Sequence, residues 1–332
     1  MGKSYNIAIV GATGAVGAEL LGVLKRRAFP VGKLKLLASA RSAGKDLDFH
    51  DETIPVEELT ENSFTGIDLA FFCAGGDLSR TFVPAAVATG AVVVDNSSVF
   101  RMDPTVPLVI PEINGPDVDN HRGIIANPNC TTAVALMALY PLHQAFGLER
   151  VFASSYQAVS GSGARAISEL KRQVIEEIEN RAATLEIYPH PIAFNVLPHV
   201  DKFLEEGYTK EEMKMQAEGR RIMHLPNFRA SVTCVRVPVY RAHSVAISAE
   251  FERPFSLDKA REVLAQAPGL DLLDEPSANL YPTPLAAAGK DNCQVGRLRL
   301  DCALENGLAL WVSGDQLLKG AALNAVQIAE LL

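Results

Sequence analysis

The sequence has few cysteines, and none of them is in an arrangement that binds zinc or forms a redox disulfide. Its 332 residues contain five cysteines, an odd number, and no two form the close CxxC pair of such sites. The scattered histidines, among them His190 and His199, also lack metal-ligand spacing. We therefore predict free thiols and no metal site.

Two further absences limit the class of protein. No apolar run approaches the roughly 18 residues of a membrane-spanning helix, and no cationic leader with a cleavable apolar stretch precedes the first strand-like segment. The longest basic run is Lys25 to Arg27, and the formal net charge is −8. We expect a soluble, cytoplasmic protein that binds neither membranes nor nucleic acid.

The pattern of apolar residues indicates two α/β domains. From Tyr5 to about Asn129, short β-branched runs alternate with helical stretches, which predicts a doubly wound, Rossmann-type parallel sheet. The segments 108–114 and 124–129 are expected to extend that sheet. Longer strands after Cys130 predict a mixed or antiparallel sheet with a helix near 164–183. The tail, 314–332, reads as one amphipathic helix.

Three glycines between the first predicted strand and helix indicate a dinucleotide site. Gly11, Gly14 and Gly17 permit a tight turn and close backbone approach, so that amides at the helix N-terminus can hold a pyrophosphate. The strand before and the helix after supply the structural context that the motif requires. The other residues expected at the cofactor in this loop are Thr13, Ala15 and Val16.

The end of the second strand favours NADP over NAD. An NAD site would place a carboxylate there for the ribose hydroxyl, but the sequence reads "ASARSAGK". Arg41 and Ser42, with Lys45, could instead pair with a 2'-phosphate. The alternative is a solvated basic loop.

Cys130 has unusual surroundings for a structural thiol. It follows "NPN" and precedes "TT" at the expected start of a helix, whereas Cys73 and Cys234 lie in apolar strand-like runs typical of buried thiols. A helix N-terminus lowers the pKa of a cysteine, and the thiolate is the nucleophilic form. A nucleotide-binding domain followed by such a cysteine suggests hydride transfer to or from a thioester.

Several separated motifs together resemble the aspartate-semialdehyde dehydrogenases. They are "VGATGAVG", "ASARSAGK", "DNSSVFRMD", "PEIN", "NPNCTT", "YQAVSGSG", "EEMK", "CVRVPVYRAHS" and "KGAALNAVQIAE", and they cover nearly the whole chain. The resemblance implies NADPH-dependent reductive dephosphorylation of β-aspartyl phosphate to aspartate β-semialdehyde and phosphate. That reaction belongs to the biosynthesis of lysine, threonine, methionine and isoleucine.

The resemblance also implies roles for individual residues. Cys130 would carry the acyl group, Gln157 would orient its carbonyl, and His243 would be the general acid and base. The substrate and phosphate would contact Arg236, Glu211, Arg101, Lys214 and Asn129, and the nicotinamide would lie near Ser160, Gly161 and Gln316. Many relatives have asparagine at the position of Gln316.

Local patterns add two expectations. A single strand with alternating faces would send Arg236 and His243 to opposite sides, unless a turn or bulge near Pro238 intervenes. Thr209 and Glu212 form a capping-box pattern that predicts a helix start. Glu211 and Lys214 then share a face of that helix, as substrate contacts or as a solvated ion pair.

The resemblance fixes the expected domains and leaves two other functions to weigh. Residues 1–129, completed by the helix 314–332, would bind NADP. Residues 130–313 would form a catalytic and dimerisation domain like that of glyceraldehyde-3-phosphate dehydrogenase, in a homodimer or a tetramer. The alternatives are an N-acetyl-glutamyl phosphate reductase, against which "NPNCTT" and "EEMK" argue, and a non-catalytic homologue of the same fold.

Overall fold

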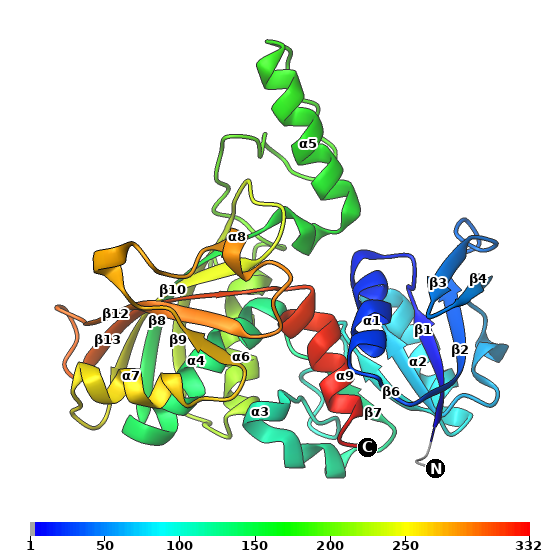
Figure 1. Ribbon diagram of the computed structural model, residues 1–332, viewed down its shortest axis with the longest axis horizontal. Coiled ribbons are helices and arrows are strands. Elements are labelled where there is room, and N and C mark those ends of the chain that lie inside the picture. Colours follow the sequence, from blue (N-terminus) through cyan, green and yellow to red (C-terminus); the bar gives the residue numbers. More distant parts are fainter. Residues whose placement is uncertain (1–3) are drawn as a thin grey trace. The chain divides into compact units, whose positions relative to one another are not determined.

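The computed structural model describes residues 4–332 of the chain and divides them into two compact units. The first unit runs up to Asn129 and takes in Ala321–Leu332. The second is Cys130–Gly320. The chain therefore changes unit between Asn129 and Cys130 and again between Gly320 and Ala321. Figure 1 shows the helices and strands of both units, coloured along the sequence.

The first unit is built on a seven-stranded sheet with the order β3-β4-β2-β1-β5-β6-β7. Pairing is parallel throughout except between β3 and β4. The predicted doubly wound parallel sheet is thus confirmed. Its strands are β1 (Tyr5–Val10), β2 (Val31–Ala38), β3 (Asp46–Phe49), β4 (Glu52–Glu58), β5 (Leu69–Phe72), β6 (Val92–Asp95) and β7 (Ile124–Ala126).

Helices and short turns connect these strands. The apolar residues of α1 (Ala15–Arg26) and α2 (Gly76–Ala88) that recur at helical spacing are buried, for example Leu20, Val23 and Leu24 in α1. The remaining helical elements are the short α3 (Pro111–Asn114) and the 3-10 turns η1 (Glu61–Phe64) and η2 (Gly115–Asn120).

One local expectation for this unit was wrong, and one hairpin was not predicted. The segment 108–114 does not extend the sheet, because Leu108 makes only an isolated bridge and Pro111 begins α3, where a proline lacking an N–H is favoured. The hairpin of β3 and β4 had no prediction, since its residues are mostly exposed and lack a clear apolar alternation.

The tail is not the single amphipathic helix that the sequence suggested. Strand β13 runs on to Gly314, a π-helical turn η5 spans Leu318–Ala322, and only Leu323–Ala329 forms the α-helix α9. Nearly every residue from 314 to 329 is buried, so this part of the tail has no solvent-exposed face. Within the first unit, Arg27 holds Glu330 by two hydrogen bonds of 2.6 Å.

The second unit is built on a six-stranded mixed sheet with the order β11-β12-β13-β10-β8-β9. Pairing is antiparallel except between β8 and β9 and between β11 and β12. The strands are β8 (Leu148–Gln157), β9 (Arg229–Arg236), β10 (His243–Phe251), β11 (Leu270–Leu272), β12 (Cys293–Leu300) and β13 (Gly307–Gly314).

Helices α4 (Cys130–Phe146), α6 (Lys210–Ile222) and α7 (Leu257–Ala265) pack on one face of this sheet. The side chains of alternate residues, such as Val151, Val245 and Val312, are buried on that face. The opposite face is more open: Phe152 is 48% exposed, and Tyr156 packs against Trp311 with ring centroids 5.2 Å apart.

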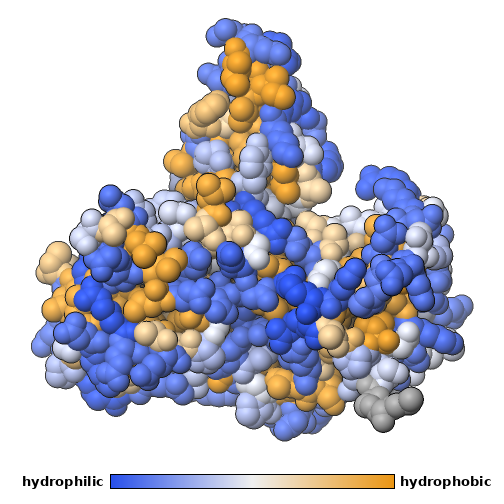
Figure 2. Space-filling model, viewed as in Figure 1, coloured by the Kyte–Doolittle hydropathy of each residue, from blue (hydrophilic) through white to orange (hydrophobic). Residues whose placement is uncertain are grey.

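Helix α5 (Ala164–Ile178) forms an arm that projects from the rest of the second unit, and apolar side chains show on its surface (Figures 1 and 2). It ends five residues before the predicted limit. Buried Glu169, Gln173 and Glu176 accept hydrogen bonds from backbone amides of the returning segment 184–193. The unit also contains η3 (Val159–Ser162), η4 (Pro276–Ala278) and α8 (Pro284–Ala287).

Candidate active site

Three predicted site residues lie at one end of three neighbouring strands in the second unit. Gln157 ends β8 and pairs in parallel register with Arg236, which ends β9. His243 begins β10, and the next residue, Ser244, pairs with Tyr156 of β8. Since side chains alternate between faces and all three are buried, Gln157, Arg236 and His243 share one face.

The expected conflict between Arg236 and His243 does not arise, because they belong to different strands. The chain leaves β9 at Arg236, turns through residues 237–242 and returns in β10 on the other side of β8. The turn that the sequence allowed near Pro238 is present.

Cys130 is the first residue of α4, which packs on the same face of the sheet. The pairing partner of His243 in β13 is Gly314, and a Cβ atom there would lie 2.8 Å from Val134, one turn into α4. A Cβ atom on Gly320 would lie 2.7 Å from that of Cys130. The N-terminal end of α4 therefore lies at the strand ends that carry the other predicted residues.

The other cysteines differ from Cys130, which is half-buried. Burial raises the pKa of the Cys73 thiol to about 12 and that of Cys234 to about 12. Both thiols are therefore un-ionised at neutral pH, in agreement with their apolar sequence context. Cys293 is buried and Cys302 is exposed.

His243 is completely buried, and its ring bonds the backbone of Ala158 and of Ala242. Its Nδ1 accepts from the amide of Ala158 at 3.0 Å, whereas Nε2 has no partner among the described residues. Burial and the neighbouring charge of Arg236 hold the pKa of the imidazole well below its usual value of 6.5. The ring is therefore neutral at neutral pH.

Arg236 is held by the same residue that holds His243. Its Nη1 donates to the carbonyl oxygen of Ala158 at 2.7 Å, and its guanidinium carbon lies 5.9 Å from the ring centre of Tyr188. Its Nε is buried without a partner within residues 4–332. A Cβ atom on Gly161 would lie 2.9 Å from that Nη1 and 3.3 Å from Nε2 of His243, so glycine keeps this space open.

Gln316 joins the start of β10 to the turn η3. Its side-chain oxygen accepts from the amide of Ala242 at 2.8 Å, and its side-chain nitrogen bonds the hydroxyl of Ser160. Ala242 has a φ of 71°, a left-handed conformation that disfavours residues with a side chain and is found at functional sites. Gln316 therefore fixes the backbone immediately before His243.

Gln157 begins a chain of polar contacts that leads to α6. Its side-chain nitrogen donates to Glu211 at 3.1 Å, and Lys214 donates to Glu211 at 2.7 Å and to Asp201 at 3.1 Å. Burial alone would lower the pKa of Lys214, but the two carboxylates outweigh it and raise that pKa. Glu211 and Lys214 thus form a partly buried pair beside Gln157, which is more than a solvated surface contact.

The predicted cofactor loop lies in the first unit and has the expected local geometry. Gly11 has a φ of 82° and would bring a Cβ atom 2.7 Å from the carbonyl oxygen of Cys73. Gly14 caps α1, which has no acidic residue in its first turn. On Gly17, a Cβ atom would lie 2.7 Å from the Cα atom of Ala12. The loop therefore presents the N-terminal amides of α1 without an opposing charge.

The other predicted residues of the first unit lie at carboxyl ends of strands. Arg41 is exposed and Ser42 is buried in the turn after β2. Arg101 is buried, and its guanidinium donates to the carbonyls of Asn127 and Asn96 at 2.8 Å each. Asn129 is buried at the end of this unit. Ligands of parallel α/β sheets bind at this edge.

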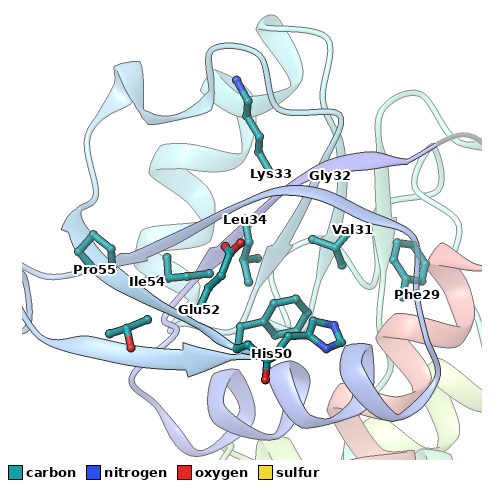
Figure 3. Close-up of a pocket in the computed structure, with 12 residues that line it drawn as sticks. Phe29, Val31, Gly32, Lys33, Leu34, His50, Glu52, Ile54 and Pro55 are labelled. Carbon is teal, nitrogen blue, oxygen red and sulfur yellow. The ribbon is translucent and has the colours of Figure 1, made fainter.

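A surface pocket of about 670 Å³ lies at the opposite edge of the same sheet (Figure 3). It is enclosed by the first residues of β2, including Val31 and Lys33, and by the β3–β4 hairpin with His50 and Glu52. Because it lies at the amino end of β2, it is separate from the glycine loop. In the part of the chain that the structure describes, no group of three metal-binding side chains forms a metal site, and no helix is long and apolar enough to cross a membrane.

Three residues of the site were missed by sequence reasoning. Ala158 acts through its backbone, Tyr188 reaches Arg236 from beyond α5, and Asp315 forms a 2.5 Å ion pair with Arg241 beside Ala242. A backbone contact leaves no signal in a side-chain pattern. The motif "YQAVSGSG" contains Ala158, so the motif could have indicated that residue even though its side chain could not.

Two family models match the chain. The model described as "Semialdehyde dehydrogenase, NAD binding domain" matches residues 6–121, and "Semialdehyde dehydrogenase, dimerisation domain" matches residues 139–319. Together they cover most of both compact units.

Relatives and solved structures match over nearly the full length. The aspartate-semialdehyde dehydrogenases of Aquifex aeolicus and Synechocystis sp. are 52% and 49% identical, covering 99% and 100% of this chain and 98% of each relative. The crystal structure of aspartate semialdehyde dehydrogenase II from Vibrio cholerae, complexed with ASA, has a TM-score of 0.97 at 43% identity, covering 100% of this chain and 98% of that one.

Proposed function

We propose that this chain, which belongs to the aspartate-semialdehyde dehydrogenase family, catalyses the NADPH-dependent reduction of β-aspartyl phosphate to aspartate β-semialdehyde and phosphate. The observation that carries the proposal is the grouping of Gln157, Arg236 and His243 on one face of a sheet, at the end where α4 begins with Cys130.

Cys130 is the proposed nucleophile. The N-terminal dipole of α4 favours the thiolate, which attacks the acyl carbon and expels phosphate to leave a thioester. Gln157 is proposed to orient the acyl oxygen and His243 to act on the same oxygen. NADPH, when bound, supplies the hydride that reduces the thioester. The thiolate then leaves, and the aldehyde is released.

Arg236 and the pair of Glu211 and Lys214 are proposed to bind the substrate. The guanidinium of Arg236 suits the α-carboxylate, because its planar fork can donate two parallel hydrogen bonds. Glu211 suits the α-amino group, and Lys214, with Arg101 and Asn129, suits the phosphate. The raised pKa of Lys214 is consistent with a permanent positive charge at that position.

The first unit is proposed to bind NADP. Gly11, Gly14 and Gly17, with Thr13, Ala15 and Val16, would hold the pyrophosphate at the start of α1, and Arg41 and Ser42 would hold the 2'-phosphate. The turn of residues 39–45 contains no carboxylate that would repel that phosphate. Ser160, Gly161 and Gln316 are the proposed nicotinamide contacts.

A homodimer and a cytoplasmic location complete the proposal. The family model that matches residues 139–319 is described as a dimerisation domain, and the open sheet face with Phe152 and Trp311 offers an apolar surface for a second copy. Sedimentation should give twice the 35.7 kDa of one chain, or four times that mass for a tetramer. The proposed biosynthetic reaction supports the cytoplasmic location.

The test is the reverse reaction, phosphate-dependent reduction of NADP with aspartate semialdehyde. Parallel assays with NAD and with N-acetyl-glutamate semialdehyde decide the cofactor and the substrate class. Activity only with the second semialdehyde would favour the N-acetyl-glutamyl phosphate reductase. Absence of activity with either one would favour the non-catalytic homologue.

A further inference from the structure

Asp315 is a fully buried acidic residue that has no role in the proposed reaction. It directly follows β13 and is 0% exposed. Its carboxylate accepts hydrogen bonds from the amides of Leu317 at 3.0 Å and Gly289 at 2.6 Å, and from Nε of Arg241 at 2.5 Å. A buried carboxylate is tolerated only where such donors replace the lost water, so Asp315 ties three separate segments to one point.

One set of contacts leads from Asp315 to Cys130. The bond from Leu317 fixes the turn after β13, and the carbonyl oxygen of Asp315 accepts from the amides of Leu318 at 3.1 Å and Gly320 at 3.2 Å. The bond from Gly320 spans five residues, as in the π-helical turn η5, and such turns are frequent at functional sites. A Cβ atom on Gly320 would lie 2.7 Å from the Cβ and 3.1 Å from the Cα of Cys130. The turn η5 therefore sets how closely the chain approaches the proposed nucleophile.

A second set of contacts leads from Asp315 to His243. Arg241, which the carboxylate holds, precedes Ala242, whose φ is 71°. This left-handed conformation is unfavourable for alanine and persists only where the surroundings hold it. The amide of Ala242 also donates to Gln316, the neighbour of Asp315. Asp315 and Gln316 thus bond the two residues that lead into His243.

We infer that Asp315 is a positioning residue, which fixes Cys130 and His243 relative to each other. It acts on the first through η5 and on the second through Arg241 and Ala242. The inference rests on the proposed function, because that function gives the two residues their roles. A misplacement of about 1 Å, caused by a change away from the reacting atoms, can lower turnover about 100-fold.

Asp274 provides a matched control in the same unit. Its side chain is 1% exposed, and it accepts from Nε of Arg261 at 3.0 Å and from the amide of Leu298 at 3.2 Å. Arg261 lies in α7 and Leu298 in β12, outside the segments that lead to Cys130 or His243. Asp274→Ala and Asp315→Ala both leave buried donors without an acceptor, so both should lower the Tm.

The first test is NMR of the full-length protein labelled at cysteine with carbon-13 and at histidine with nitrogen-15. Cys130→Ser and His243→Gln assign the two signals. Asp315→Ala should shift the signals of both Cys130 and His243, and Asp274→Ala should shift neither. Unchanged signals of Cys130 and His243 in Asp315→Ala would overturn the inference. If Asp315→Ala does not fold, Asp315→Asn, which keeps the size of the side chain, replaces it with the same expected result.

Two further variants separate the two sets of contacts. Arg241→Gln should shift the signal of His243 and leave that of Cys130, whereas Gly320→Ala should shift the signal of Cys130 and leave that of His243. An unshifted His243 signal in Arg241→Gln, or an unshifted Cys130 signal in Gly320→Ala, would contradict the inference even if every Asp315 variant failed to fold.

The second test is steady-state kinetics, with rates expressed per folded protein from circular dichroism. Asp315→Ala should lower kcat about 100-fold. It should leave the KM for aspartate semialdehyde within about threefold, because the proposed substrate contacts Arg236 and Glu211 are held by Ala158 and by Gln157 and Lys214. Asp274→Ala should keep kcat within about twofold. Equal kcat values in the two variants would overturn the inference. The NMR needs no substrate, so expected shifts in a protein without activity would refute the proposed function and leave the positioning by Asp315 standing.

Discussion

Gln157 and Arg236 are direct partners in the parallel register of β8 and β9, and they end their strands side by side. This pairing places an amide that bonds Glu211 next to a guanidinium that bonds the backbone of Ala158. Two separate polar networks, one from α6 and one from η3, therefore meet at these two strand ends.

Tyr188 is a positioning residue for Arg236, since its ring lies under the guanidinium, while its hydroxyl bonds the carbonyl of Val159 at 3.4 Å and the side chain of Ser162. We expect Tyr188→Leu to raise the KM for aspartate semialdehyde roughly 10-fold, because a desolvated cation–π contact contributes up to about 2 kcal/mol. Tyr188→Phe keeps the ring and should leave KM within about twofold. Equal effects of the two variants on KM would mean that the hydroxyl, or only the fold, is responsible.

Gly17 and Gly22 lie on the same helix and should respond oppositely to alanine. A Cβ atom on Gly17 would meet the backbone of Gly11 and Ala12, whereas one on Gly22 meets nothing within 4 Å. Gly17→Ala should destabilise the first unit and weaken NADP binding at least about 10-fold, as close backbone approach is lost. Gly22→Ala should stabilise the protein by about 0.5–1 kcal/mol, since alanine is the better helix former.

These two variants are measured by thermal unfolding and by NADP titration. If Gly17→Ala bound NADP as well as Gly22→Ala, the glycine loop would not be the cofactor site.

The capping box of α6 is the clearest local feature that the sequence predicted. The amide of Thr209 donates to Glu212 at 2.7 Å, and the amide of Glu212 donates to the hydroxyl of Thr209 at 3.3 Å. Thr209→Ala should lower the free energy of unfolding by about 1–2 kcal/mol. It should also lower activity, because α6 carries Glu211 and Lys214.

The matched control is Ser256→Ala, which removes the exposed cap of α7 at Lys259. It should lose no more than about 1 kcal/mol and keep full activity. Chemical denaturation together with the NADP assay measures both variants, and loss of activity in Ser256→Ala would show that the readout is not specific to α6.

Acid should destabilise the protein through His243. Its folded-state pKa is lowered, so below the unfolded value of about 6.5 the unfolded state binds a proton that the folded state does not. Stability from this group is therefore complete above pH 6.5 and falls by about 1.4 kcal/mol per pH unit below it. Urea unfolding at pH 7.5 and 5.5 should give a smaller decrease in His243→Gln, and an equal decrease would contradict a buried neutral imidazole.

The periodic parts of the fold could be predicted from the sequence, and the exceptions have physical causes. Buried parallel strands and α1 are continuous or periodic in their apolar residues, so they were found. Residues 314–329 are nearly all buried and bend through a π-helical turn. Their apolar pattern therefore does not show where the strand ends and the helix begins. The hairpin of β3 and β4 is exposed and carried no apolar signal.

The site could be predicted only where its side chains belong to a recognisable sequence motif. Cys130 stood out because of its position at a helix start, and the role of Gln157 came from the family resemblance. Sequence spacing alone predicted that Arg236 and His243 would lie on opposite faces of one strand. It could not show that they belong to two strands, β9 and β10, with β8 between them. The hydrogen bond to Nδ1 of His243 comes from a backbone amide 85 residues away in the sequence, which no local pattern reveals.

The central claim is that Cys130 carries the acyl group, and mass spectrometry of the acylated enzyme tests it most directly. Enzyme mixed with aspartate semialdehyde and NADP without phosphate, then quenched in acid, should form one NADPH per site and an aspartyl thioester on the Cys130 peptide. Added phosphate should remove that adduct, and Cys130→Ala should form neither product. An aspartyl group on another residue, or a normal burst of NADPH from Cys130→Ala, would contradict the account.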